Sequence, residues 1–264
     1  MKTKHEILTA LAHSGEEKIL LASLLDKEHT CETRGYATST RFLSMSERAL
    51  CTEAVHQAGA TGHALFWGGY EDAERGIYLF YPDYMDEESA RLSAPLALLR
   101  AHKSRSDTLT HRDYLGAILG LGIRREWVGD ILVQEHGAYV FCLPSVAPAL
   151  LGLEHVGRTG VKAAAVELAA VPVPERKVRP VTFTVQSARL DAVVSGMFRL
   201  SRTSAAAQVR AGAVHLNYTE CLRPDAPVAP GDVLSLRGAG KGSVTEVGGM
   251  SRKGRQFVTA ELWL

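Results

Sequence analysis

The residues best suited to chemistry are cations beside the start of a short helix in the last third of the chain. Ser201 is a good N-cap, and Gly212 stands where a glycine would end the helix that follows. The N-terminus of such a helix presents unpaired backbone N–H groups and the positive end of the helix dipole. Arg202 lies in this first turn, and Arg210 follows about 80° around the helix, so both can face one side. These residue types at this spacing predict a surface that binds phosphate groups.

The elements that must position these cations follow from the apolar spacing on both sides of them. Four apolar residues at helical spacing predict a first short helix: Leu190, Val193, Val194 and Met197. Apolar and polar residues then alternate around Val214 and Leu216, and again from Val233 to Leu236 after the turn Pro230-Gly231-Asp232. We therefore expect two short helices followed by short strands.

Positive charge is concentrated in the same part of the chain. Residues 183–264 carry ten Lys and Arg against six Asp and Glu, whereas residues 1–182 carry 20 against 23. The formal net charge of +1 for the whole chain therefore hides a basic C-terminal part, which favours a nucleic-acid partner. For single residues an ordinary structural role stays open: Arg189 and Asp191 could pair or cap, and Asn217 could be a turn residue.

A second basic concentration lies between residues 100 and 125. Its six cations face only Asp107 and Asp113 in the same segment. These cations are Arg100, Lys103, Arg105, Arg112, Arg124 and Arg125. The segment is a candidate second RNA surface, and the alternative is a solvated helix face and loop.

Aromatic residues alternate along two expected strands, at Tyr78 and Phe80 and again at Tyr139 and Phe141. In RNA-recognition motifs such rings stack on unpaired bases. Aromatic residues in strands also build hydrophobic cores, and the core is the more frequent role. Both roles stay open for these four residues.

The chain is long enough for two or three domains, and the spacing of its apolar residues changes along its length. Residues 1–60 read as a helical region, including a helix from Arg48 to Ala58 that Gly59 ends. Residues 61–170 read as an α+β domain, similar to an RNA-recognition motif or a ferredoxin fold. Residues 171–180, rich in proline and cations, read as a stiff linker, and residues 181–264 as the RNA-binding module. The predicted fold class is α+β.

Within residues 61–170 the strand pattern recurs five times and two helices interrupt it. The expected strands are 63–67, 76–81, 96–102, 127–133 and 138–143, and the expected helices are 111–121 and 145–152. His111-Arg112-Asp113 matches the opening of a protein-kinase catalytic loop, but that loop requires Asn where this chain has Ile118. We interpret Thr110 with Asp113 as a helix cap instead.

Composition excludes several other classes of protein. No apolar run approaches the roughly 20 residues that span a bilayer, and the first residues lack the apolar core of a signal peptide. Cys31, Cys51, Cys142 and Cys221 lack the spacing of metal or redox sites, so we expect reduced, inert thiols. The sequence therefore predicts a cytoplasmic protein that uses no cofactor or metal and does not insert into membranes.

Several motifs, in order along the chain, carry a resemblance to a known family. They are Trp67-Gly-Gly-Tyr70 with Ala73-Glu74-Arg75, the segment Thr110–Ile123, Val128-Gly-Asp-Ile-Leu-Val133, and the C-terminal module. Together they look like the YlmH family of bacterial proteins, which carry an RNA-binding domain named after ribosomal small-subunit protein four. The resemblance covers residues 48–258, and the first 40 residues carry little of it.

What the resemblance implies is a non-enzymatic RNA-binding protein of the ribosome. Its expected partners are rRNA of the large ribosomal subunit and a peptidyl-tRNA. Its expected role is to assist the rescue of stalled translation in ribosome-associated quality control. Family members have also been linked to cell division.

The family's RNA-contacting positions correspond here to eight residues of the C-terminal module. They are Arg189, Ser201, Arg202, Thr203, Arg210, Asn217, Arg237 and Lys241. This chain departs from the family at Ala239 and Lys241, where relatives often carry an aromatic residue and an arginine. Lysine lacks the planar guanidinium of arginine, so we expect Lys241 to contact a phosphate and not to stack.

The alternative function is an RNA-modifying enzyme of the pseudouridine-synthase type. Such enzymes carry the same module, and their catalytic strand contains an Arg-Leu-Asp followed by Ser-Gly, which Arg189-Leu190-Asp191 and Ser195-Gly196 imitate. Their Asp lies within a large catalytic domain, whereas here the same residues open the small module. We therefore expect a protein that is not an enzyme.

Overall fold

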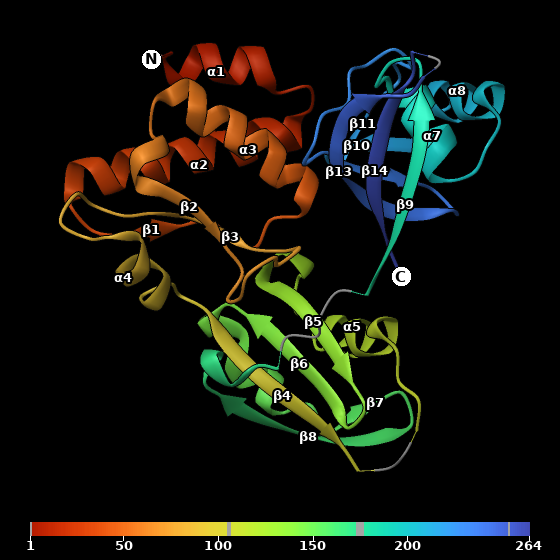
Figure 1. Cartoon of the computed structure of the whole chain (residues 1–264). Helices are drawn as coiled ribbons and strands as arrows, with labels where there is room; N and C mark the ends of the chain where they lie inside the picture. Colours follow the sequence, from red (N-terminus) through yellow and green to blue (C-terminus); the bar gives the residue numbers. More distant parts are fainter. Residues whose placement is uncertain (1, 105–106, 173–176, 253) are drawn as a thin grey trace. The chain divides into compact units, whose positions relative to one another are not determined.

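The computed structural model describes residues 2–104, 107–172, 177–252 and 254–264. The chain divides into two compact units, Met1–Pro174 and Glu175–Leu264, which we call the N-terminal and C-terminal units (Figure 1). Both units combine helices with antiparallel sheets, so the predicted α+β class is confirmed.

Three helices open the N-terminal unit, and local sequence signals set their ends. They are α1 Lys4–Leu11, α2 Gly15–Arg34 and α3 Met45–Ala58. Ser44 and Glu47 form a capping box, in which the hydroxyl and the carboxylate accept the first free N–H groups of α3. Gly59 ends α3 at φ +79°, as the sequence predicts, because a left-handed residue suits glycine.

The three helices pack on one face of a small antiparallel sheet. Its strands are β1 Thr38–Ser39, β2 Ala64–Trp67 and β3 Ile77–Phe80, in the order β1-β3-β2. Leu21 and Leu24 of α2 share a buried cluster with Tyr78 and Phe80 of β3. A stacking role for Tyr78 and Phe80 is therefore excluded, because helices cover both rings.

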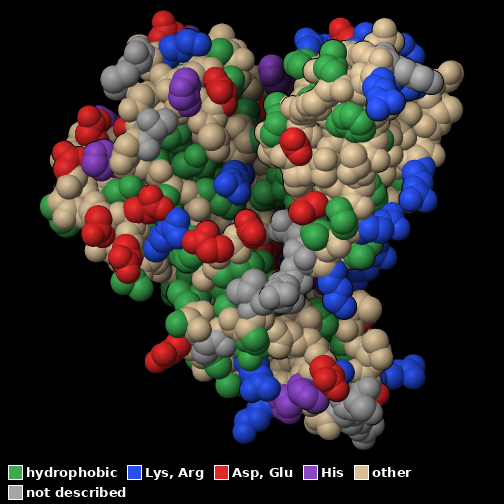
Figure 2. Space-filling view, viewed as in Figure 1, with side chains coloured by type: hydrophobic (Ala, Val, Ile, Leu, Met, Phe, Trp, Pro, Cys, Tyr) green, Lys and Arg blue, Asp and Glu red, His purple; other side chains and the backbone are tan. Residues whose placement is uncertain are grey.

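A five-stranded antiparallel sheet forms the rest of the N-terminal unit, in the order β5-β6-β4-β8-β7. Its strands are β4 Ala97–Lys103, β5 Val128–Gln134, β6 Gly137–Cys142, β7 His155–Val156 and β8 Thr159–Val166. The helices of this part are α4 Glu87–Leu92, α5 His111–Gly120 and α6 Ala147–Leu151. Single 3-10 turns lie at Thr61–His63, Arg125–Trp127, Pro144–Val146 and Leu168–Ala170. In Figure 2, Asp and Glu side chains gather over α2 and α4.

The chain order β4-α5-β5-β6-α6-β8 is the β-α-β-β-α-β arrangement of ferredoxin-like folds. Helices α5 and α6 cover one face of the sheet, where Tyr114, Ile118 and Leu150 pack against Leu99 and Val140. The predicted cap of α5 is confirmed: Asp113 Oδ2 accepts hydrogen bonds from both the backbone N–H and the hydroxyl of Thr110, each at 2.7 Å.

The other face of this sheet is buried at one end of its strands and exposed at the other end. At one end, Leu98 of β4 and Phe141 of β6 join Phe42, Ile77 and Leu79 in a buried cluster that connects the two sheets. Phe141 is therefore a core residue and cannot stack on a base. Strands β2 and β3, which the sequence grouped with the later strands, form a separate sheet in which β3 pairs with both β1 and β2. This sheet packs against the five-stranded sheet through the same cluster.

The C-terminal unit folds two helices onto a six-stranded antiparallel sheet, in the order β11-β10-β12-β13-β14-β9. The helices are α7 Leu190–Met197 and α8 Arg202–Arg210. The strands are β9 Val178–Val185, β10 Val214–Leu216, β11 Thr219–Glu220, β12 Val233–Leu236, β13 Gly240–Met250 and β14 Gln256–Trp263. Both predicted helices and the strands at 214–216 and 233–236 are confirmed. The predicted linker 171–180 is only partly one, since β9 begins at Val178; its residues 173–176 lie outside the described residues.

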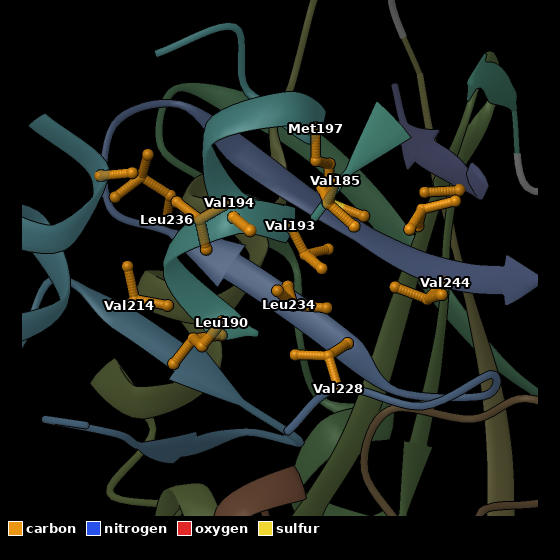
Figure 3. Close-up of a cluster of buried hydrophobic side chains, with 14 of the residues drawn as sticks. Val185, Leu190, Val193, Val194, Met197, Val214, Val228, Leu234, Leu236 and Val244 are labelled. Carbon is orange, nitrogen blue, oxygen red and sulfur yellow. The ribbon is translucent and has the colours of Figure 1, made fainter. Parts of the chain in front are cut away.

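The apolar side of α7 fixes the core of this unit. Leu190, Val193, Val194 and Met197, the four residues expected on one stripe, are all buried (Figure 3). They pack against strand residues such as Leu234 of β12. Because α7 is anchored along its length, its N-terminal end has a fixed place beside α8.

Candidate nucleic-acid interface

A buried carboxylate joins the two arginines that flank the starts of α7 and α8. Asp191, in the first turn of α7, is only 6% exposed. Its Oδ2 accepts a hydrogen bond from Arg202 Nη2 at 2.9 Å, and Arg189 Nε lies 3.5 Å from its Oδ1. The side chains of Arg189 and Arg202 remain 46% and 51% exposed. Asp191 therefore holds both guanidinium groups at the surface, side by side.

The start of α8 adds backbone donors to this pair. Ser201 is the N-cap, as predicted, and its Oγ accepts the N–H of Ser204 at 3.1 Å. Arg202 and Thr203 follow in the exposed first turn, where helical N–H groups have no partner within the helix. The predicted residues Arg189, Ser201, Arg202 and Thr203 are thus brought together around one helix end that favours anions.

Two further arginines lie at the other end of α8. Arg210 occupies the last turn and is exposed, about 12 Å along the helix axis from Arg202. Arg237 is also exposed, and its backbone N–H donates to Ala213 O at 3.0 Å, just beyond α8. Cations therefore lie at both ends of one short helix. We call this set the α7–α8 surface: Arg189, Ser201, Arg202, Thr203, Arg210 and Arg237. In Figure 2, Lys and Arg side chains follow one margin of the C-terminal unit.

Asn217 and Lys241 are engaged in contacts within the unit. The amide of Asn217 donates to Asp232 Oδ1 at 2.8 Å and accepts the N–H of Val233 at 2.9 Å, in a turn where Asn217 has φ +50°. The turn role that the sequence left open for Asn217 is therefore present. Lys241 Nζ lies 4.4 Å from the ring centroids of both Tyr218 and Trp263. The two rings hold the ammonium group through cation–π contacts.

The second basic set, at residues 100–125, does not form one surface. Arg100 and Lys103 lie on opposite faces of β4, and Lys103 Nζ donates to Asp107 O. Arg112 is exposed on α5, whereas Arg124 lies 4.3 Å over the ring of Trp127. Arg125 Nη1 donates to the carbonyls of Val128 and Gly129, and burial lowers its pKa to about 10. Arg105 lies outside the described residues.

Sequence reasoning missed the structural use of Asp130. This residue of β5 is 9% exposed, and desolvation by burial raises its pKa. Its carboxylate accepts three hydrogen bonds, from the hydroxyl of Tyr70 and the N–H of Glu74 at 2.7 Å and from the N–H of Arg75 at 3.1 Å. Two of the motifs behind the family resemblance, around Tyr70 and Asp130, therefore bind each other and fix a loop to β5.

None of the four cysteines forms a disulfide among the described residues. All four are free, Cys31, Cys51 and Cys142 are buried, and burial raises the pKa of Cys51 and of Cys142 to about 12. These two thiols stay protonated at neutral pH. Over the described residues, no helix has the length and apolarity needed to cross a membrane, and no group of metal-binding side chains forms.

The chain is similar to known proteins over most of its length. Residues 99–170 match the family model described as "Putative RNA-binding domain in YlmH". A "Ribosome-associated protein quality control protein P2" from Bacillus subtilis is 30% identical over 247 residues, which cover 93% of this chain and 95% of the relative. The structure of a "Cell division protein ylmH from Streptococcus pneumoniae" is 22% identical, with a TM-score of 0.48, and covers 60% of this chain and 95% of that one.

Proposed function

The chain belongs to the YlmH family, and from this premise we propose that it binds RNA through the α7–α8 surface and acts in ribosome-associated quality control. The observation that carries the proposal is the arginine pair that Asp191 holds beside the start of α8. Two guanidinium groups and a helix N-terminus at one place suit the closely spaced phosphates of an RNA backbone.

The relative from Bacillus subtilis supports the choice of the ribosome. Its name states an association with ribosomes and with protein quality control, and the two chains match over nearly their full lengths. We infer that the bound RNA is rRNA of the large subunit together with a peptidyl-tRNA, and that the protein acts in the cytoplasm. A stalled large subunit that still carries its tRNA would offer both RNAs to one protein.

The enzymatic alternative is less well supported by the C-terminal unit. In a pseudouridine synthase of this type, Asp191 would be the catalytic residue. Here its carboxylate is buried and its Oδ2 is bound by Arg202 at 2.9 Å. A carboxylate that two arginines cover serves to position those arginines, which favours a binding protein without catalysis.

The test is co-sedimentation of the full chain with free large subunits, small subunits, and large subunits that carry peptidyl-tRNA, over a salt series. The variant is Arg202→Glu with Arg237→Glu, which reverses two charges of the α7–α8 surface. The matched control is Arg179→Glu with Arg252→Glu, since these arginines are also exposed, on β9 and on the β13–β14 turn. We expect a preference for tRNA-bearing large subunits that the variant loses and the control keeps.

Full retention of binding by the variant would overturn the proposed surface. Binding of the wild type to no ribosomal particle would overturn the ribosomal role. In that case the enzymatic alternative would be tested by incubating free RNA with the protein and searching for modified uridine.

A further inference from the structure

The five-stranded sheet of the N-terminal unit exposes part of one face. Its strand register places Arg100 beside Tyr139 on one side and Ala164 on the other. Two residues further along β4, His102 pairs with Gly137 and with Lys162. Because neighbouring strands place paired residues on the same face, these side chains continue the row that begins with buried Leu98 and Phe141. We call this part the open sheet face: Arg100, His102, His136, Tyr139 and Lys162.

The open sheet face combines a ring with cations. The guanidinium of Arg100 lies 6.0 Å from the centroid of the half-buried Tyr139 ring. The rings of His102 and His136 lie 6.5 Å apart beside them, and a hollow of about 220 Å³ is lined by Arg100, His136 and Tyr139 among others. In Figure 2, Lys, Arg and His side chains gather over the end of this sheet that lies lowest in the view.

The cations of this face are available to a ligand. Arg100, His102 and Lys162 are exposed, and among the residues that the structure describes neither Arg100 nor Lys162 pairs with a carboxylate. Glu135, at the tip of the β5–β6 turn, is the nearest acidic residue in sequence and lies 4.0 Å from His136. An exposed, positively charged sheet is complementary to a polyanion.

We propose that the open sheet face binds single-stranded RNA, with a base stacked on Tyr139 and phosphates at Arg100 and Lys162. A flat sheet offers a stacking platform to an unpaired base, whereas the bases of a duplex are hidden in its stack. Leu98 and Phe141 at the other end of the row are buried, so Tyr139 is the ring of this row that a base can reach. The site therefore selects an unpaired nucleotide with little sequence preference.

For its class of ligand the inference relies on the proposed function and on the family model over residues 99–170, whose description names a putative RNA-binding domain. It adds the face, the residues and the single-stranded form of the RNA, and it uses a different unit from the α7–α8 surface. The α7–α8 surface offers cations and helix N–H groups without an accessible platform of this kind. The open sheet face adds the aromatic ring of Tyr139, on which a base can stack. Each surface can therefore be removed without the other.

The experiment is photocrosslinking of the full chain to a short oligouridylate that carries one 4-thiouridine, together with binding measured by fluorescence anisotropy. The variants are Tyr139→Leu, which keeps the apolar packing and removes the ring, and Arg100→Gln with Lys162→Gln. The matched control is Arg158→Gln, on the exposed β7–β8 turn of the same sheet. Ribosome co-sedimentation of the same variants is measured in parallel.

We expect crosslinks within strands β4, β6 or β8, and about tenfold weaker binding for each variant but not for the control. Crosslinks confined to the C-terminal unit, or variants that bind like Arg158→Gln, would overturn the inference. So would an acidic peptide that occupies this face more tightly than the oligouridylate. If the oligouridylate site is found while Arg202→Glu with Arg237→Glu still binds ribosomes, the proposed α7–α8 surface fails and the open sheet face stands.

Discussion

At the scale of single residues, Asp191 shows how a buried side chain can shape a surface that it does not join. The carboxylate lies under two half-exposed arginines and fixes the distance between them. A guanidinium that is already held in place loses less side-chain entropy when a phosphate binds. On the proposed function, Asp191 is therefore a positioning residue for RNA binding.

Asp191→Asn tests this role, because a positioning role and a simple charge effect predict changes of opposite direction in RNA affinity. Removal of a negative charge near a polyanion should by itself strengthen RNA binding. We expect instead a several-fold loss of affinity, because the arginines are no longer held, while the slope of affinity against salt concentration stays unchanged. Asp225→Asn, at an exposed acidic residue of the same unit, is the control and should bind slightly more tightly. An equal gain for both variants would contradict the positioning role.

Asp130→Asn tests the hydrogen-bond network of the N-terminal unit. The three donors that point at this carboxylate would face an amide that supplies only one acceptor oxygen. We expect a loss of about 1 to 3 kcal/mol in the free energy of unfolding, measured by urea denaturation. Glu135→Gln, at an exposed residue of the same unit, should change stability little, and an equal effect of the two substitutions would argue against the network.

At the scale of elements, two helical glycines should respond to alanine in opposite directions. A Cβ at Gly196 in α7 would lie 2.1 Å from the ring of Phe183 in β9, whereas a Cβ at Gly116 in α5 meets nothing within 4 Å. Gly196→Ala should therefore destabilise the C-terminal unit by about 1 to 3 kcal/mol. Gly116→Ala should stabilise the N-terminal unit by about 0.5 to 1 kcal/mol. Hydrogen exchange read by mass spectrometry reports the two units separately, and a stabilising Gly196→Ala would contradict the close packing of α7 on β9.

The sequence predicted the elements whose ends carry local signals. Thr110 and Ser201 cap helices as expected, because an N-cap depends on residues only three positions apart. The helix expected from Arg48 begins at Met45, after a cap at Ser44 that was not predicted. Strands β8, β9 and β13 were not predicted. Strand β8 contains several alanines and β13 several glycines. Neither residue type favours a strand by itself, so these strands depend on pairing with neighbouring strands. Pro180 made β9 read as a linker, although proline fits the edge strand that β9 forms.

The positions of some candidate site residues followed from the sequence, and the positions of others did not. Helix geometry sufficed to place Ser201 and Arg202 at the start of α8. Arg189 and Thr203 were proposed from the family resemblance, and Arg189 comes close to Arg202 through Asp191 of α7. The sequence left a turn role open for Asn217, but the partners of Asn217 and Lys241 could not be read from it. Asp232 lies in the turn before β12 and Trp263 ends β14, both far along the chain. The sequence offered Arg100 and Tyr139 separately as candidates for RNA contact but could not join them into one face with Lys162, because Lys162 comes near them only through the pairing of β8 with β4.

At the scale of the whole molecule, the two units should differ in their response to alkali. Burial raises the pKa of Cys51 and of Cys142 to about 12 from an ordinary value of 9.0, and both thiols belong to the N-terminal unit. A raised pKa favours the neutral thiol in the folded state. The stability that this contributes is complete below pH 9 and is lost as the pH rises from 9 towards 12.

Between pH 8 and pH 10 we therefore expect a loss of about 1 kcal/mol per thiol in the stability of the N-terminal unit. The measurement is urea unfolding at both pH values for the wild type and for Cys51→Ala with Cys142→Ala. The double variant should be less stable overall, because it leaves cavities, but its stability should fall less with pH. An identical fall in both proteins would show that the thiols are not the groups that titrate.

The sheet of the C-terminal unit has a consequence for biosynthesis. Among the described residues, its first strand in sequence, β9, pairs with its last strand, β14, and with no other, and β14 lies between β9 and β13. While the protein is being translated, β9 must wait without a partner until β14 has left the exit tunnel of the ribosome. The N-terminal unit has no such dependence and can fold first. A nascent chain therefore cannot complete this sheet, which supports α7, until β14 has been synthesised. The RNA binding proposed for the α7–α8 surface is delayed until the same point.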